Sequence, residues 1–344
     1  MTTGIVSVAA WPFAALIITL FLVRGAIVYA HRRGMLDQPG QRRSHSIPTP
    51  RGGGIGVVIA LLVCLPGALL ITSTAWTIPV VISLETAFAL VALVGWWDDH
   101  RPLPVSPRFG AQLLAVLLFS SALLATGLSW WWLPLLLGAG AWSINLHNFM
   151  DGIDGLLAQQ IIFVGAGLSV ISWSIGQTAL AVGAAAMAAS ACGFWIYNRP
   201  TARIFMGDVG SGSAGLLIFA LGAMLWRLDH ALVWPVLILS SAFLLDATLT
   251  LVMRMLRGKR WYSPHREHLY QWMTRRGGTH AGTDARYTAW NLLVAGPLAW
   301  LAFSHLNIGL PITMALYVGA SVLWLVLKRR CTRRNLSKDR HVAA

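Results

Sequence analysis

The feature that most constrains this chain is a succession of apolar segments, each long enough to cross a lipid bilayer as a helix. A membrane-spanning helix needs about 20 mostly apolar residues and satisfies its own backbone hydrogen bonds. Eleven such segments cover residues 5–30, 52–72, 78–97, 109–127, 129–146, 156–174, 178–196, 211–227, 231–253, 286–306 and 308–327. Hydrophobic residues make up 56% of the chain and charged residues 11%, so no separate soluble domain is evident. We therefore expect an all-α, polytopic membrane protein with about 11 transmembrane helices, in which residues 1–327 form one integral-membrane domain and residues 328–344 a basic tail.

The basic residues predict which side of the membrane each connection faces. They fill the first connection and alternate ones after it; eight lie between Arg254 and Arg286, and seven follow Leu327. Only Arg227 falls in a connection of the other set. Because cytoplasmic connections carry the excess of Lys and Arg, we expect a periplasmic N-terminus and a cytoplasmic C-terminus. The net charge of +14 then belongs to one membrane face, where it would attract anionic lipid headgroups, and it does not imply nucleic acid as a partner.

A polar stretch, NLHNFMDGIDG at residues 145–155, stands between the fifth and sixth apolar segments. Its amide and carboxylate side chains recur every third residue, at Asn145, Asn148, Asp151 and Asp154. The glycines can loosen a helix there and let these side chains converge. Carboxylates beside hydrocarbon are costly and usually line a water-filled cavity, so we interpret the stretch as a binding site. The alternative is a capped turn between helices, because Asn and Asp favour helix N-termini.

Two further acidic motifs lie at helix ends that are predicted to face the cytoplasm. Asp98 and Asp99 end the third apolar segment, and Asp208 lies in the glycine-rich run IFMGDVGSGS, residues 204–213, before the eighth. Adjacent carboxylates at a membrane surface suit phosphate chemistry, in which one ligates Mg2+ and the other accepts a proton. Glycines let a backbone approach a diphosphate. For the Asp98–Asp99 pair, capping of the next helix is the alternative.

A fourth motif, SPHREHLYQ at residues 263–271, lies in the longest cytoplasmic connection. His265, Arg266 and His268 could hold phosphoryl oxygens, with the arginine binding in bidentate fashion. A solvated charged loop would explain the same residues equally well.

Asp246, within the ninth apolar segment, is a further candidate. It lies eight residues before Arg254 and eleven before Arg257, so the three could share a helix face and reach the same pocket. A polar contact within or between helices is the alternative.

Together these motifs resemble, in order and spacing, the polyprenyl-phosphate N-acetylhexosamine-1-phosphate transferases. The resemblance rests on residues 95–99 (GWWDD), 145–155, 204–211 and 265–268 (HREH), and it covers nearly the whole chain. This superfamily also contains the phospho-N-acetylmuramoyl-pentapeptide transferase of peptidoglycan synthesis. The first connection, from Asp37 through RRSH at 42–45 to PTPRGGG at 48–54, resembles the branch that starts O-antigen and related surface glycans.

The resemblance implies transfer of an N-acetylated sugar 1-phosphate, with 6-deoxy sugars included, from a UDP-sugar to undecaprenyl phosphate, releasing UMP. It implies a site at the cytoplasmic face of the bacterial inner membrane, with Mg2+, or Mn2+ in its place, as the metal. The implied roles are catalysis by Asp98 and Asp99, metal binding by Asp208 and Asp99, nucleotide binding by Asn145, Asn148, Asp151 and Asp154, and diphosphate binding by His265, Arg266 and His268.

Two positions depart from the family pattern. Pro102 stands where many relatives carry a third aspartate, so no role for that aspartate can be transferred. The fourth motif lacks the tandem histidines of the peptidoglycan enzyme, which argues against a muramyl-pentapeptide substrate.

Two other classes of protein would also use many spans and acidic residues. A transporter tends to hold its charged groups near the midplane at broken helices, whereas these carboxylates lie at helix ends. An enzyme that joins CDP-activated alcohols to phospholipid headgroups would show a tight cluster of aspartates on one helix pair, and we find none. The identity of the sugar depends on the shape of the pocket, and neither it nor the oligomeric state follows from the sequence.

Overall fold

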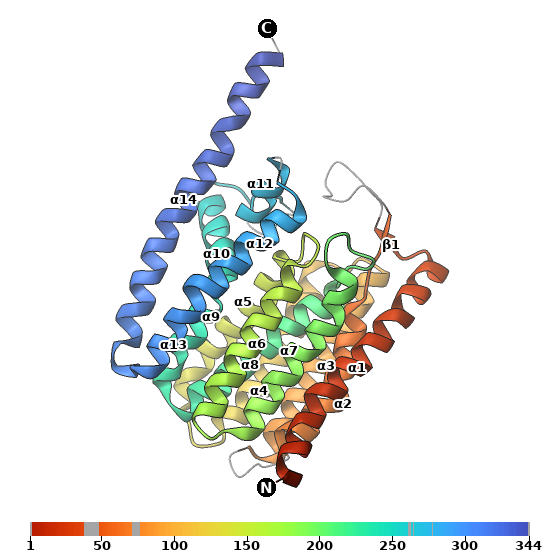
Figure 1. Cartoon of the computed structure of the whole chain (residues 1–344), viewed down its shortest axis with the longest axis vertical. Coiled ribbons are helices and arrows are strands. Elements are labelled where there is room, and N and C mark those ends of the chain that lie inside the picture. Colours follow the sequence, from red (N-terminus) through yellow and green to blue (C-terminus); the bar gives the residue numbers. More distant parts are fainter. Residues whose placement is uncertain are drawn as a thin grey trace.

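The structure, a computed structural model, describes residues 2–37, 48–70, 76–260, 263, 265–276 and 278–342. It is a bundle of helices with its two termini at opposite ends (Figure 1). The helices are α1 (Thr2–Arg33), α2 (Gly54–Leu70), α3 (Ile78–His100), α4 (Val105–Leu124), α5 (Leu133–Phe149), α6 (Leu156–Ser174), α7 (Thr178–Asn198), α8 (Asp208–Leu228), α9 (Val233–Leu239), α10 (Ser241–Leu256), α11 (Leu269–Arg275), α12 (His280–Trp290), α13 (Gly296–Ser304) and α14 (Gly309–Val342). Two short strands, β1 (Leu36–Asp37) and β2 (Thr49–Pro50), pair antiparallel in the first connection.

Every apolar segment expected to be helical contains helix, and the predicted all-α class is confirmed. Among the described residues, seven helices are long and apolar enough to cross a membrane, and α9 with α10, which meet at a 79° bend, would make an eighth. Helix α2 is apolar but shorter, and a π-helical turn over Asn291–Ala295 separates α12 from α13. The protein is therefore a multi-pass helical membrane protein, while the count of 11 spans and the sidedness of the termini stay predictions.

Helix α8 lies at the centre of the bundle, and glycines let its neighbours approach closely. A Cβ atom added to Gly54 on α2 would lie 2.4 Å from the Cα atom of Gly210 on α8. One added to Gly95 on α3 would lie 2.5 Å from the carbonyl oxygen of Asp208. Small residues at such contacts allow the close packing on which helix association in membranes depends. The approach of α3 to the start of α8 brings the acidic ends of these two helices together.

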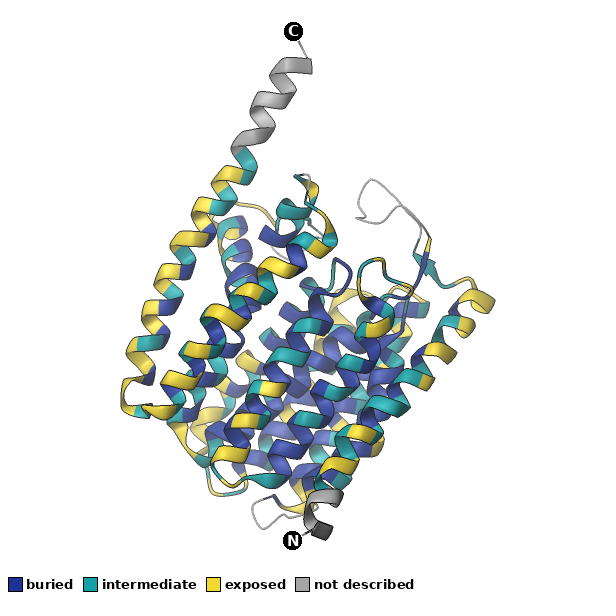
Figure 2. Ribbon diagram, in the orientation of Figure 1, coloured by how far each residue is buried: buried dark blue, intermediate teal, exposed yellow. Residues whose placement is uncertain are grey.

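Burial divides the helices into a core and an outer surface (Figure 2). The central helices are largely buried, whereas α1 and α14 expose large apolar side chains such as Phe21 and Val318, which are 73% and 63% exposed. Apolar surface of this extent on the outside of a helical bundle is what lipid would cover. The described part of the connection between α1 and α2, together with α11, lies at the end of the bundle where α3 and α5 end and α8 begins (Figure 1).

Candidate active site

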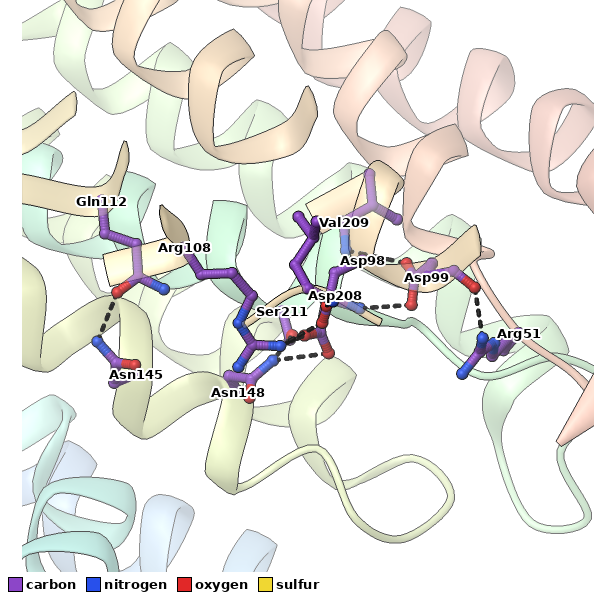
Figure 3. Close-up of polar contacts among 11 residues, drawn as sticks. Arg51, Asp98, Asp99, Arg108, Gln112, Asn145, Asn148, Asp208, Val209 and Ser211 are labelled. Atoms are coloured by element: carbon purple, nitrogen blue, oxygen red, sulfur yellow. Dashed lines mark hydrogen bonds and ion pairs between the residues drawn. The ribbon is translucent and has the colours of Figure 1, made fainter. Parts of the chain in front are cut away.

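The ends of two helices, α3 and α5, and the starts of two others, α4 and α8, bring the acidic motifs together (Figure 3). Asp98 and Asp99 lie in the last turn of α3, Asp208 is the first residue of α8, and Asn148 lies in the last turn of α5. Arg108 enters the group from the first turn of α4. Residues that are far apart in the sequence thus form one polar cluster at one end of the bundle.

Arg108 joins the carboxylates of Asp98 and Asp208. Its Nη1 atom forms an ion pair with Oδ2 of Asp98 and lies 3.0 Å from Oδ2 of Asp208. The other oxygen of Asp98 accepts a hydrogen bond from the backbone N–H of Leu103 at 2.6 Å. All three charged side chains keep some exposure, so they form an accessible site at the end of the bundle. In the sequence Arg108 indicates only the sidedness of its connection, and no local pattern predicts this role.

Asp99 plays a different part from its neighbour. Its two carboxylate oxygens accept hydrogen bonds from the backbone N–H groups of Asp208 and Val209, each at 3.1 Å. The side chain is only 4% exposed, and Arg51 donates a hydrogen bond to its backbone carbonyl oxygen. A carboxylate in this position satisfies free N–H groups of a helix N-terminus and opposes its positive dipole end. The capping role considered for the aspartate pair therefore applies to Asp99, although the capped helix is α8.

Gly207, just before α8, makes this arrangement sterically feasible. Its φ of 77° lies in the left-handed region, which side chains with a Cβ atom rarely adopt. A Cβ atom there would lie 2.6 Å from a carboxylate oxygen of Asp99. The glycine of the glycine-rich motif thus allows the Asp99 carboxylate to reach the start of α8.

Asn148 and Asn145 contact different partners. The amide nitrogen of Asn148 donates to Oδ1 of Asp208 at 2.9 Å and to the hydroxyl oxygen of Ser211 at 3.0 Å. The amide nitrogen of Asn145 donates to Oε1 of Gln112 at 2.7 Å. Both asparagines line a small cavity of about 30 Å³ that also touches Arg108 and Asp208. The structure therefore places both beside the carboxylate cluster.

Asp151 and Asp154 have different surroundings. Burial, with smaller contributions from the negative charges of Asp208 and Asp99, raises the pKa of Asp151 to about 8. Asp151 is therefore near enough to Asp208 and Asp99 for their charges to act on it. Asp154 instead accepts a hydrogen bond from the backbone N–H of Ala202 at 3.1 Å and lies 3.1 Å from Nδ1 of His280 on α12. Its contacts join the connection before α8 to α12.

The fourth motif stands beside the polar stretch at 145–155. The His268 ring stacks on Phe149 with 6.2 Å between ring centroids, and the His265 ring lies 4.9 Å from that of His268. The hydroxyl of Tyr270 donates to the carbonyl oxygen of Phe149 at 3.0 Å. These contacts hold the loop with His265, Arg266 and His268 next to the last turn of α5.

Asp246 anchors the fourth motif. Its carboxylate accepts hydrogen bonds from the backbone N–H groups of Leu269 and Tyr270, at 2.7 and 3.2 Å, and from the side chains of Tyr287 and Trp324, at 2.8 and 2.9 Å. The aspartate is buried and sits at the N-terminus of α11. Of the two interpretations, the structure therefore favours a polar contact between helices.

Arg254, in the last turn of α10, also contacts the fourth motif. It forms an ion pair with Glu267 and donates to the carbonyl oxygen of Arg260 at 2.8 Å and the hydroxyl of Ser263 at 3.1 Å. Its hydrogen-bonding groups therefore fasten the loop that carries His265 and His268.

The donor chemistry at Asp98 and Asp208 fits a hard divalent cation. Carboxylate oxygens are preferred ligands of Mg2+, which commonly takes one or two carboxylates plus substrate phosphates. Oδ2 of each aspartate faces the same Arg108 nitrogen. Among the described residues, no three His, Cys, Asp or Glu side chains form a ready-made metal group. The two facing carboxylates suit a metal that shares its coordination with a substrate.

Some positions noted in the sequence lie outside the described residues. These are RRSH at 42–45, on which the resemblance to the O-antigen branch partly rests, and Pro264 of the fourth motif.

Comparisons with known proteins place the residues of this cluster within a family match. Residues 81–225, which contain both aspartates of α3, the stretch 145–155 and Asp208, match glycosyl transferase family 4. The chain is 31% identical to the phospho-N-acetylmuramoyl-pentapeptide-transferase of Moorella thermoacetica, over 74% of this chain and 87% of that protein. It is 27% identical to the decaprenyl-phosphate N-acetylglucosaminephosphotransferase of Mycobacterium leprae, over 92% of this chain and 89% of that protein. A probable undecaprenyl-phosphate N-acetylglucosaminyl 1-phosphate transferase of Bacillus subtilis is 28% identical, over 77% of this chain and 75% of its own length.

The helical fold, the carboxylate cluster at the helix ends and these similarities define a multi-pass membrane transferase. The chain belongs to glycosyl transferase family 4, together with the polyprenyl-phosphate N-acetylhexosamine-1-phosphate transferases. The family predicted from the four motifs is confirmed.

Proposed function

We propose that this protein transfers an N-acetylated sugar 1-phosphate from a UDP-sugar to undecaprenyl phosphate at the cytoplasmic face of a bacterial inner membrane. The products are UMP and a lipid-linked diphosphate sugar. Relatives named for decaprenyl phosphate or undecaprenyl phosphate and for N-acetylglucosamine support the substrate classes. The observation that carries the proposal is the pairing of Asp98 with Asp208 across Arg108, which brings two carboxylates and a cation to one point at the helix ends.

The reaction exchanges one phosphate bond for another. An oxygen of the lipid phosphate attacks the β-phosphorus of the UDP-sugar and forms a new P–O bond. The bond from that phosphorus to the oxygen bridging the two phosphates breaks, and UMP leaves with the bridging oxygen. Because both reactants are anions, the site must supply positive charge where they meet. Bound Mg2+ would neutralise part of the phosphate charge.

The residues divide this work according to their positions. We assign Asp98 to orient or deprotonate the lipid phosphate and Asp208 to hold the metal. Asp99 would assist metal binding by fixing the position of Asp208 at the start of α8. Arg108, in the first turn of α4, would supply positive charge to the phosphates beside a metal held by these aspartates.

The nucleotide and its diphosphate would be held by the two remaining motifs. We assign Asn145, Asn148, Asp151 and Asp154 to the nucleotide side, and His265, Arg266 and His268 to the diphosphate. Burial, together with the nearby charges of His268 and Arg254, lowers the pKa of His265 to about 4. This histidine is therefore neutral at pH 7 and would donate a hydrogen bond, so Arg266 would carry the positive charge.

We further propose that the sugar belongs to the N-acetylated, including 6-deoxy, class and that the product initiates O-antigen or a related surface glycan. The first connection supports this branch, and the missing tandem histidines argue against a muramyl-pentapeptide. Identity alone does not choose between them, because relatives of both kinds are similar to this chain to nearly the same degree.

The test supplies purified protein with undecaprenyl phosphate, Mg2+ and a UDP-sugar labelled in the β-phosphate. UDP-N-acetylglucosamine, UDP-N-acetylgalactosamine and the 6-deoxy N-acetylated UDP-sugars are tried separately. The label should move to the lipid while UMP appears, because attack on the β-phosphorus keeps that phosphorus in the product. Release of UDP, or no lipid-dependent UMP with any sugar, would contradict the proposal. Transfer of unchanged substrate across a sealed vesicle would indicate a transporter.

A further inference from the structure

A second cavity, with cationic and apolar lining, lies between α10 and α14, which are neighbours in the bundle (Figure 1). Its volume is about 170 Å³, and none of the residues assigned to the reaction lines it. Its cationic lining consists of Arg257, Lys328 and Arg329, and its apolar lining includes Met253, Trp324 and Leu325. On both helices the basic residues follow the apolar ones toward the C-terminal end. The cavity thus changes from apolar to cationic along the direction of the two helices.

The cavity carries an excess of positive charge. Glu267 also lines it, but Oε1 of this residue already contacts Arg254 and lies 3.0 Å from Lys259. Arg257 and Arg329 are exposed, and neither forms an ion pair within the described part of the chain. A cavity with three cations and one neutralised carboxylate favours an anionic ligand.

Lys328 is the strongest sign that a partner is missing. Its Nζ atom is buried and has no hydrogen-bond partner among the described residues. The atom lies 5.1 Å from the ring centroid of Trp324 and 5.9 Å from that of Trp272. Burying a cation without a counter-ion is costly, and ring faces offset only part of that cost. Asp246 and Glu267 are near enough to act electrostatically on Lys328. The oxygens of Asp246 already accept hydrogen bonds from Leu269, Tyr270 and other donors, and Glu267 already pairs with two other cations.

The surroundings place the cavity at a membrane surface. Leu256, next to Arg257, is 77% exposed, and Val322 and Val326 on α14 are also exposed. In a membrane protein these side chains face lipid, and the cations lie just beyond them. Basic pockets between transmembrane helices at this depth are suited to the headgroups of anionic lipids.

We propose that the cavity between α10 and α14 binds the phosphodiester headgroup of an anionic bilayer phospholipid. Arg257 and Arg329 contact the phosphate, and Lys328 adds positive charge beneath it. Met253 and Leu325 contact the upper part of an acyl chain. The bound lipid would brace α14 against α10 beside the loop of the fourth motif, to which Glu267 belongs.

The test compares lipid binding by full-length protein in neutral detergent, measured by native mass spectrometry with dioleoylphosphatidylglycerol and with dioleoylphosphatidylcholine. The test variant is Arg257→Gln/Arg329→Gln. The control, Arg32→Gln/Arg330→Gln, loses the same charge outside the cavity. Each direct ion pair between an exposed arginine of the cavity and the phosphate contributes a factor of up to about five in affinity, so the test variant should bind phosphatidylglycerol up to roughly 25-fold more weakly. The control should bind like the native protein, and phosphatidylcholine should not distinguish the three proteins.

Further measurements separate this site from other anions and from misfolding. Arg257→Lys/Arg329→Lys keeps the charge and should retain most of the binding. The Michaelis constant for undecaprenyl phosphate should not change in the glutamine variant. Equal phosphatidylglycerol binding by test variant and control would overturn the proposal. So would displacement of the lipid by millimolar inorganic phosphate, or a raised Michaelis constant for undecaprenyl phosphate with unchanged phosphatidylglycerol binding.

Discussion

The carboxylate of Asp99 caps the helix that begins at Asp208, accepting the backbone N–H of that residue at 3.1 Å. Its second oxygen takes the N–H of Val209, so both oxygens are engaged at the start of α8. Its neighbour Asp98 faces the Asp208 side chain through Arg108. The two adjacent aspartates therefore have separable roles: one fixes a helix end, and the other stands where the substrates would meet.

We expect Asp98→Asn and Asp99→Asn to differ in their effect on stability. Asp98→Asn should lower turnover by about 100-fold or more, because it removes a charge needed at the reacting phosphates, and should change the free energy of unfolding by less than about 1 kcal/mol. Asp99→Asn should lower turnover and also destabilise by about 1–2 kcal/mol, because an amide group cannot accept both N–H bonds. UMP release and thermal unfolding measure the two effects.

The matched control for both variants is Asp229→Asn. Asp229 is an exposed aspartate that caps a short helical turn after α8. It should keep near-native turnover. Native turnover in both Asp98→Asn and Asp99→Asn at saturating Mg2+ would show that the reaction takes place elsewhere.

Removing Arg108 should make stability depend on Mg2+. Without the guanidinium, Asp98 and Asp208 face each other with no cation between them, and their repulsion should lower the melting temperature of Arg108→Gln in EDTA. Mg2+ should restore most of the loss, because a divalent cation can take the place of the arginine nitrogen. The native protein should gain less from Mg2+. Equal shifts for both proteins on adding Mg2+ would argue against a metal at this pair.

The sequence predicts much of this arrangement because membrane helices and phosphate chemistry leave strong patterns. The length of the apolar segments predicts the helices, and the scarce carboxylates after 78–97 and before 211–227 predict candidate site residues on one membrane face. The structure brings Asp98, Asp208 and Asn148 together. It also joins the fourth motif to the polar stretch at 145–155, through the contact of His268 with Phe149.

The remaining features depend on tertiary contacts that no local pattern encodes. Arg108 is one of many arginines, and only the packing of α4 against α3 selects it. Asp246 has no sequence neighbour that reveals its partners, which come from α11, α12 and α14. No proline or glycine stands at the 79° bend between α9 and α10, so the sequence predicts one continuous helix over 231–253.

Asp246→Asn should impair the enzyme through the fourth motif. An amide cannot accept the donors that now converge on the carboxylate, so α11 should loosen, at a cost of about 2 kcal/mol in unfolding free energy. Turnover should fall because His265 and His268 lose their position, although Asp246 touches no substrate. Addition of excess UDP-sugar should recover part of the rate. A variant with native stability but no activity would instead place Asp246 in the reaction itself.

Topology can be tested with reporters at the two ends of the chain. Because the basic connections predict the cytoplasmic face, a reporter fused after Leu327 should read as cytoplasmic, and one fused at Thr2 as periplasmic. The termini lie at opposite ends of the bundle, as this prediction requires (Figure 1). A cytoplasmic reading at Thr2 would contradict the count of 11 spans, and the assignment of the carboxylate cluster to the cytoplasmic face would then need an independent test.

The last prediction concerns His265, whose pKa is lowered from 6.5 to about 4, chiefly by burial. Between these two pH values the unfolded chain binds more protons at this residue than the folded protein, so stability falls as pH falls from about 6.5 to about 4. His265→Gln removes this term, and its melting temperature should therefore decline less over that range than that of the native protein. Above pH 6.5 the two curves should run parallel. The pKa of His268 is also lowered by burial, so the stability of His265→Gln should still fall somewhat as the pH is lowered. Because His265 stays neutral from pH 6 to 8, it should contribute no step to the pH profile of turnover in that range. If the stability curves of the variant and the native protein instead stayed parallel down to pH 4, His265 would be protonated as readily in the folded protein as in the unfolded chain.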